Sequence, residues 1–151
     1  MKIVSLNKKA FAEYDILDRY TAGIVLTGDE VKSARAGHCG IADSFAVFKG
    51  DELFMLNAYF AKYSHAFSKQ PADDRQSRKL LLTKQELRRL LGEVSKKGLT
   101  IIPLKLFFHD NGLLKIEIGL AKHKKIHDRK QELKERDLDR QARRDLKSLR
   151  G

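Results

Sequence analysis

The stretch LTIIPLKLFFHDNGLLKIEIGL, residues 99–120, is the strongest structural signal in the sequence. Apolar residues alternate with other residues on both sides of Asn111-Gly112, a pair that suits the positive φ angles of a hairpin turn. Alternation predicts four inward side chains on each strand. These are Ile102, Leu104, Leu106 and Phe108 on the first strand, and Leu114, Ile116, Ile118 and Leu120 on the second. The stretch therefore predicts an antiparallel β-hairpin.

Further strands are predicted earlier in the chain. YDILDRYTAGIVL (residues 14–26) and DSFAVFKGDELFMLNAYF (43–60) supply three or four of them, the latter pair turning at Gly50-Asp51. Pro103 has no amide to donate, so we expect it at a strand edge or a β-bulge. Six or so short antiparallel strands with few helices predict a mainly β fold, an oligonucleotide-binding (OB)-like antiparallel barrel rather than a sandwich, although the pattern alone does not decide between them.

Two helices begin with the same capping signal. In LTGDEV and LTKQEL a Thr stands three residues before a Glu, so Thr27 with Glu30 and Thr83 with Glu86 are predicted capping boxes. The second helix then carries the apolar stripe Leu87, Leu90, Leu91 and Val94, and we expect it to stop at Gly98. The first is shorter and ends near Gly37. A brief third helix is predicted from Asn7 to about Glu13, and a long mobile loop between residues 61 and 77.

Composition limits the class of protein. A chain of 151 residues that is 42% hydrophobic can form one domain with a real core. One cysteine, Cys39, excludes an intramolecular disulfide, and neither a signal peptide nor an apolar membrane span is evident, so we expect a cytoplasmic protein. The formal net charge of +11 favours an anionic partner.

The last 30 residues differ from the rest. Residues 122–151 contain 12 Lys or Arg, 6 Asp or Glu and only five Leu, Ile, Val or Phe, which gives +6 of the +11 (12 minus 6). Such a segment buries too little apolar surface to offset the entropy of ordering it. We therefore expect a folded domain over residues 1–121 and, over 122–151, a basic tail that is disordered when free.

Nothing in the sequence predicts catalysis. His123 and His127 have i, i+4 spacing, but no second ligand pair has metal-site spacing, so we expect no metal and no cofactor. His38 and Cys39 lack the wider context of a nucleophile, and phosphate-binding and hydrolase motifs are missing from the sequence.

Positive charge is instead distributed over several clusters: Lys32 and Arg35; Arg75, Arg78 and Lys79; Lys115; Lys122, Lys124 and Lys125. Tyr59 and Tyr63 lie where they could stack on unpaired bases. Each cluster alone is more simply a solvated charged face, but together with the tail they favour RNA.

Four stretches are more specific. LTGDEVKSARAG (26–37), RKLLLTKQEL (78–87), KGLTIIPLKLFF (97–108) and IGLAKHKKIHDRK (118–130) resemble, in order and spacing, signature stretches of the SsrA-binding protein family, also called small protein B (SmpB). The similarity extends from LNKKAFAEY to KERD.

This resemblance implies an OB-like barrel with flanking helices and a non-catalytic adaptor that binds transfer-messenger RNA (tmRNA, SsrA RNA). Members hold the tRNA-like part of that RNA and deliver it to stalled bacterial ribosomes for trans-translation, protein and RNA together mimicking a tRNA. Ribosomal contacts in the decoding centre and the mRNA channel, a tail that is helical there, and an indirect link to elongation factor Tu are implied as well.

Matching positions give candidate site residues. The implied RNA-binding surface comprises Glu30, Lys32, Arg35, Asn57, Arg78, Lys79, Leu81, Lys115 and Lys122, to which the adjacent Lys124 and Lys125 are added. The implied ribosome-contacting tail comprises His127, Asp128, Arg129, Lys130, Lys134, Arg136, Arg140, Arg143, Arg144 and Lys147.

The sequence departs from the family pattern at four places. Thr21 replaces a common acidic residue implicated in RNA contact, and Ala34 replaces a common Leu. The order Asp128-Arg129-Lys130 inverts the usual final pair, and His123 replaces a common Gly that could act as a hinge. Two alternatives remain open at this point: another OB-type RNA-binding translation or ribosomal protein, and a small nuclease or RNA-modifying enzyme, which would require a pocket of clustered acids or histidines.

Overall fold

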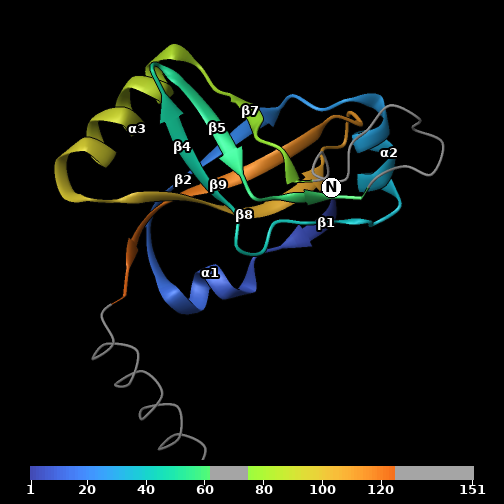
Figure 1. Ribbon diagram of the computed structural model, residues 1–151, viewed down its shortest axis with the longest axis horizontal. Coiled ribbons are helices and arrows are strands. Elements are labelled where there is room, and N and C mark those ends of the chain that lie inside the picture. Colours follow the sequence, from blue (N-terminus) through green and yellow to red (C-terminus); the bar gives the residue numbers. More distant parts are fainter. Residues whose placement is uncertain (62–74, 125–151) are drawn as a thin grey trace, which may run out of the picture.

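The computed structural model describes residues 1–61 and 75–124. Over these residues the strands are β1 (Lys2–Leu6), β2 (Tyr14–Ile24), β3 (Cys39–Gly40), β4 (Phe45–Lys49), β5 (Glu52–Leu56), β6 (Tyr59–Phe60), β7 (Arg78–Leu81), β8 (Thr100–Phe108) and β9 (Leu114–His123). The helices are α1 (Lys8–Glu13), α2 (Gly28–Arg35) and α3 (Lys84–Lys97). The fold is therefore mainly β, with three helices in the described residues (Figure 1).

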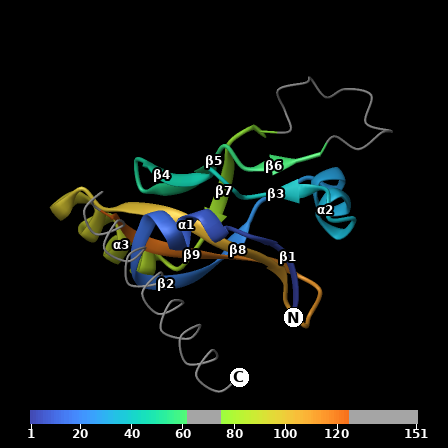
Figure 2. The same ribbon diagram turned by 90° about the horizontal axis from the view of Figure 1, so that it is seen from below.

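The strand pairings of the large sheet form a closed circuit. Its order is β1-β8-β4-β5-β7-β2-β9, and β8 pairs with β9 as well. Strand β8 thus contacts β9 along one edge and β1 and β4 along the other, so the order returns to β8. Strands β3 and β6 form a separate two-stranded sheet. Figure 2 shows α2 and α3 at opposite ends of the strands.

The predicted hairpin is confirmed. Strands β8 and β9 pair from Thr100–Ala121 to Phe108–Leu114, and the loop between them contains Gly112 at a φ of 83°. The inward set of β9 is also confirmed, since Ile116, Ile118 and Leu120 are buried in the main core.

The predicted single face of β8 is wrong, and Pro103 is the reason. The pairing of β8 with β9 shifts register between Pro103 and Lys105, as expected for a residue without an amide donor. The extra residue reverses the alternation. Ile102 and Leu104 therefore pack with Ala10 of α1 in a second, smaller core cluster, while Leu106 lies in the main core.

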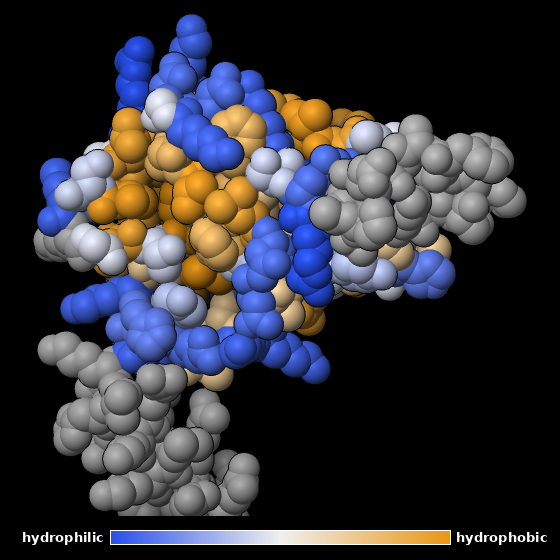
Figure 3. All heavy atoms as spheres, in the orientation of Figure 1, coloured by the Kyte–Doolittle hydropathy of each residue, from blue (hydrophilic) through white to orange (hydrophobic). Residues whose placement is uncertain are grey.

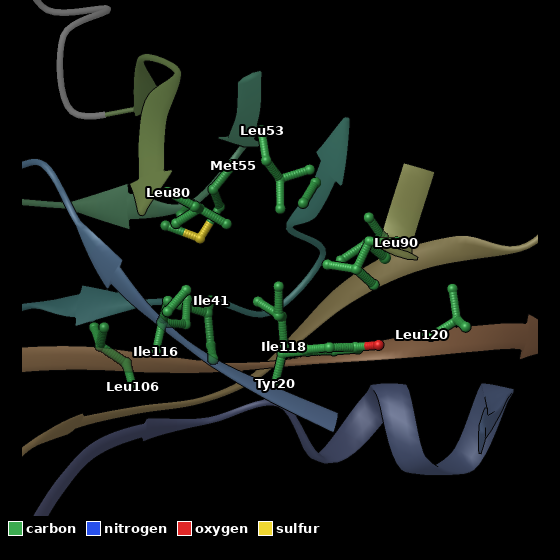
Figure 4. Packing of buried hydrophobic residues seen from close by; sticks show 14 of the residues in the cluster. Tyr20, Ile41, Leu53, Met55, Leu80, Leu90, Leu106, Ile116, Ile118 and Leu120 are labelled. Carbon is green, nitrogen blue, oxygen red and sulfur yellow. The ribbon is translucent and has the colours of Figure 1, made fainter. Parts of the chain in front are cut away.

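The main core lies inside the circuit of strands. Figure 4 shows Leu53, Met55 and Leu80 on one side, Ile116 and Ile118 on the other. Leu90 of α3 adds to it from one end. At roughly 25 cal/mol for each Å² of apolar surface removed from water, this burial is the main stabilising contribution. In the view of Figure 3, apolar side chains occupy the middle of the face and hydrophilic ones its upper and lower margins.

The helix starts are confirmed. The Thr27 hydroxyl accepts from the Glu30 amide while the Glu30 carboxylate accepts from the Thr27 amide, and Thr83 and Glu86 do the same for α3. Helix α3 ends at Gly98, whose φ of 61° is the left-handed cap that glycine favours. The brief third helix is confirmed as well: α1 runs from Lys8 to Glu13, and Asn7 is its N-cap.

Three strands and one boundary were not predicted. Strand β1, the short β3 and β7 were missed, and β9 continues through Lys122 and His123, two residues beyond the boundary expected at residue 121. The amide of Lys124 then donates to the carbonyl of Glu13. Most of the predicted 61–77 loop, and the tail from residue 125 onward, lie outside the described residues.

Candidate nucleic-acid interface

The outer face of β7, β2 and β9 brings together two of the expected RNA-binding residues. Gly23 of β2 pairs with Leu81 on one side and with Lys115 on the other. Leu81 is 49% exposed, an unusual exposure for a leucine on a strand. Because Gly23 has no side chain, Leu81 can pack closely beside it: a Cβ at Gly23 would lie 3.3 Å from the Leu81 Cβ. Lys115 has no ion-pair partner among the described residues.

Val25 and Lys79 extend this surface. We call the whole set the outer sheet face, which comprises Gly23, Val25, Lys79, Leu81 and Lys115. Lys79 precedes Leu81 by two residues and so lies on the same face of β7, and the Val25 amide donates to the Lys79 carbonyl. Val25 is 51% exposed. The Lys79 ammonium lies 3.3 Å from the Glu52 carboxylate in an exposed ion pair. Apolar contact area and two cations therefore adjoin on one face.

Glu30 and Arg78, which were expected on the RNA-binding surface, are buried in the structure. Their side chains are only 4% and 2% exposed, and the Arg78 Nε donates to Glu30 Oε2 over 2.5 Å. A second guanidinium nitrogen donates to the Ala58 and Gln76 carbonyls, each at 2.9 Å, and the group lies 4.5 Å from the centre of the Phe60 ring. Strand alternation explains the burial, since Arg78 and Leu80 point inward while Lys79 and Leu81 point outward.

The Glu30 carboxyl is charged because of its partners. Burial alone would raise its pKa, but the Thr27 amide and the Arg78 guanidinium together hold the pKa below its ordinary value. The same carboxylate thus caps α2 and pairs with Arg78.

The cations of α2 are on its outer side. Lys32 and Arg35 are exposed, and the Arg35 guanidinium lies 5.8 Å from the centre of the Phe108 ring. Phe108 pairs with Leu114, the residue before Lys115. Helix α2 and the start of β9 therefore lie at the same end of the molecule.

Asn57 is exposed and lies beside the same region. Its φ of 63° is left-handed, a conformation that Asn adopts more readily than most residues, and its side-chain amide donates to the Asp43 carbonyl at 3.2 Å. Arg75 donates to both oxygens of Asn57 at 3.4 Å and covers the Tyr59 ring at 5.5 Å. Tyr59 is thus covered by an arginine on one side, and Tyr63 lies outside the described residues.

Lys122 and Lys124 lie at the other end of β9. Lys122 is exposed and lies opposite Asp15 in the β2–β9 strand pairing, whereas Lys124 is only 8% exposed as a residue. Seven residues of strand, roughly 23 Å at 3.3 Å each, separate Lys122 from Lys115. Figure 1 shows this end of β9 far from α2. The candidates therefore form two groups.

The remaining candidates cannot be placed. Lys125 and every expected tail residue lie outside the described residues. They are Lys125, His127, Asp128, Arg129, Lys130, Lys134, Arg136, Arg140, Arg143, Arg144 and Lys147.

Cys39 and His123 lie in surroundings typical of structural rather than reactive side chains. Burial raises the pKa of the Cys39 thiol to about 11, which disfavours the nucleophilic thiolate. His123 makes an edge contact with Tyr14 at 4.9 Å. Within residues 1–61 and 75–124, no three His, Cys, Asp or Glu side chains are grouped to hold a metal ion.

No helix in that part of the chain is long and apolar enough to span a membrane.

Sequence reasoning missed Gly23 and Val25. A signal for Gly23 was available, because a glycine inside a strand pattern marks a place where something approaches the backbone closely. Val25 gave none, since an apolar residue at a strand end is expected to be buried.

The fold and the outer sheet face define a class: a small, basic, mainly β protein whose candidate ligand surface is the outside of a sheet. Comparison with known proteins identifies the family. The SmpB protein family model matches residues 4–148, and the chain belongs to this family.

Individual relatives agree. The chain is 51% identical over 134 residues to the SsrA-binding protein of Flavobacterium psychrophilum, covering 87% of each chain. It is 45% identical over 150 residues to the SsrA-binding protein of a Nitratiruptor species, covering 99% of this chain and 100% of the relative. Among solved structures, a chain described as "tmRNA-SmpB: a journey to the center of the bacterial ribosome" matches with a TM-score of 0.65 at 50% identity, covering 80% of this chain and 84% of that one.

Proposed function

We propose that this protein binds tmRNA and brings it to stalled bacterial ribosomes for trans-translation. The observation that supports this best is membership of the SmpB family along residues 4–148, with relatives named SsrA-binding proteins. The structural match to a tmRNA–SmpB complex of the bacterial ribosome supports the same partners. The role is that of a non-catalytic adaptor in the cytoplasm, where ribosomes work, with elongation factor Tu as an indirect partner.

The outer sheet face and the cations of α2 are the proposed surface for the tRNA-like part of tmRNA. Lys115, Lys79, Lys32 and Arg35 would neutralise phosphates, and Leu81 with Val25 would pack against a ribose or base over Gly23. Asn57 lies at the border of this surface. The proposed interface is wide rather than pocket-like, which suits a folded RNA recognised by shape.

The closed circuit of strands supports the further proposal that the fold is an OB-like barrel, in which a sheet face carries the nucleic-acid site. Because β9 extends to His123 and Lys124 is buried, the proposed ribosome-contacting tail would begin at residue 125 rather than 122. It would be disordered in the free protein and become helical in the mRNA channel. Lys122 and Lys124, at the root of this tail, would belong to the ribosomal side because of their separation from Lys115.

Sequencing of RNA that co-purifies with the protein from bacterial cells tests this function. We expect tmRNA to dominate, and a gel-shift assay with its isolated tRNA-like part to show direct binding. A different dominant RNA, such as ribosomal RNA alone, would instead indicate another RNA-binding translation protein.

A further inference from the structure

The two most deeply buried charged side chains of the candidate region form a single contact between elements far apart in sequence. Glu30 belongs to α2 and Arg78 begins β7, 48 residues later. With 4% and 2% of their side chains exposed, neither can reach a phosphate in this conformation. Buried ion pairs are costly to form and costly to break, so their use here requires an explanation other than direct RNA contact.

Helix α2 depends strongly on polar contacts for its position. In this helix of eight residues Ala34 is the sole buried apolar side chain. Polar contacts supply the rest: the Ser33 hydroxyl donates to the Ala61 carbonyl at 2.5 Å, and Glu30 pairs with Arg78. Without the Glu30 contact, little apolar packing would hold the helix against the sheet.

The geometry of an α-helix connects this contact to the exposed cations. At 100° per residue, Lys32 and Arg35 lie about 200° and 140° around the helix from Glu30, so they project from the opposite side. Glu30 thus holds the inner side of α2 while the two cations point outward. Arg78 belongs to the same strand, β7, that carries Lys79 and Leu81 on its outward face. The Glu30–Arg78 contact therefore joins α2 to the strand of the outer sheet face.

We propose that the Glu30–Arg78 pair is a positioning device that holds the cations of α2 in register with the outer sheet face, so that both bind one RNA. This inference rests on the proposed tmRNA function and assigns the pair no contact with RNA. The Glu30 carboxylate is suited to the task, since one oxygen accepts from the Thr27 amide at 2.9 Å while the other accepts from Arg78. The pair therefore fixes both the start of α2 and its placement.

The substitution Glu30→Gln separates this role from direct electrostatics. Glutamine can keep the capping box, but it cannot neutralise Arg78, and it makes the net charge more positive by one. Charge alone would then strengthen RNA binding. The positioning role gives the opposite result: weaker binding to the tRNA-like part of tmRNA, down to the level of the Lys32→Ala/Arg35→Ala variant. The dependence of log K on log salt should become shallower by about two contacts at 0.7–0.9 each, although no cation was removed.

A double-mutant cycle supplies the decisive readout. Lys32→Ala should weaken binding in the natural protein and have no further effect when Glu30→Gln is present. Glu86→Gln is the matched control, since Glu86 occupies the same capping position in α3 and makes no ion pair with an arginine among the described residues. That variant should leave binding unchanged or slightly tighter. Additive losses for Glu30→Gln and Lys32→Ala, or tighter binding of Glu30→Gln, would overturn the proposal.

Two further measurements keep the proposal testable if a variant or the RNA fails. Arg78→Lys retains the cation but not the planar group that donates to Glu30, Ala58 and Gln76, so it replaces Glu30→Gln if that variant does not fold. Hydrogen exchange of the α2 amides needs no RNA: Glu30→Gln should lower their protection while that of α3 is retained. Unchanged protection of α2 refutes the positioning role itself, whereas a natural protein that does not bind tmRNA refutes the proposed function.

Discussion

Replacing Lys115 with Ala should weaken tmRNA binding without disturbing the fold. Lys115 is a half-buried residue of β9 that lies beside Gly23, and no carboxylate pairs with it in the described residues. Its ammonium can therefore contact a phosphate without first leaving a protein partner. Lys79, two strands away, is paired with Glu52 at 3.3 Å and must share or break that pair to do the same.

The expected magnitude follows from counterion release. One lost phosphate contact lowers the slope of log K against log salt by about 0.7–0.9. Raising the salt from about 50 mM to about 200 mM, a fourfold change, should therefore shrink the ratio between natural and variant affinities by roughly threefold. For Lys79→Ala the change should be smaller, because part of the charge of Lys79 is already neutralised by Glu52.

Filter binding or fluorescence anisotropy with the tRNA-like part of tmRNA, across a salt series, measures both quantities. Glu52→Gln is an internal check: it releases Lys79, so binding should tighten and the salt dependence should steepen. A Lys115→Ala variant that melts normally and keeps the natural slope would show that the RNA does not lie on the outer sheet face.

Three further predictions concern stability, reactivity and the tail. Gly119→Ala should lower the free energy of unfolding by about 1–3 kcal/mol in urea titrations, because a Cβ there would lie 2.9 Å from Leu104 Cδ1 and 3.0 Å from Ile16 Cγ2; equal stability would mean that the second core cluster yields easily. Cys39 should react with a disulfide reagent at pH 8 roughly a hundredfold more slowly in the folded protein than in urea, because burial raises the pKa of its thiol to about 11 and leaves little thiolate; equal rates would contradict that burial. A chain ending at Lys130 should melt cooperatively and bind tmRNA in a gel shift yet fail to support tagging of stalled chains, whereas loss of binding would show that the tail contributes to RNA affinity.

Local signals predicted the elements whose causes are local. The capping boxes at Thr27 and Thr83 and the left-handed cap at Gly98 depend on residues within one or two turns, so they could be read from the sequence. The β8–β9 hairpin is local for the same reason. Strand β1 pairs with β8 about a hundred residues away, and its five residues gave no distinct pattern on their own.

The error at β8 illustrates the limit of period-two reasoning. Pro103 predicted a bulge or an edge, but the alternation of apolar residues was carried through it without a change of phase. A bulge adds one residue and moves every later side chain to the other face. Because apolar residues occupy both phases of this stretch, residues of both phases are buried. Leu104 packs in the cluster beside α1, and Leu106 packs in the main core. Composition alone could not reveal that two clusters existed.

The candidate site shows the same limit for charges. Glu30 and Glu86 look alike in sequence, each three residues after a capping threonine, yet only Glu30 also pairs with a buried arginine. The difference is made by Arg78, which a cluster of basic residues presents as one more exposed cation. Recognising RKLL as a strand would have corrected this, since alternation places Arg78 with the buried Leu80 and Lys79 with the exposed Leu81. Arg78, which resembles its basic neighbours in the sequence, is thus buried, and under the proposed positioning role it would affect RNA binding only through α2.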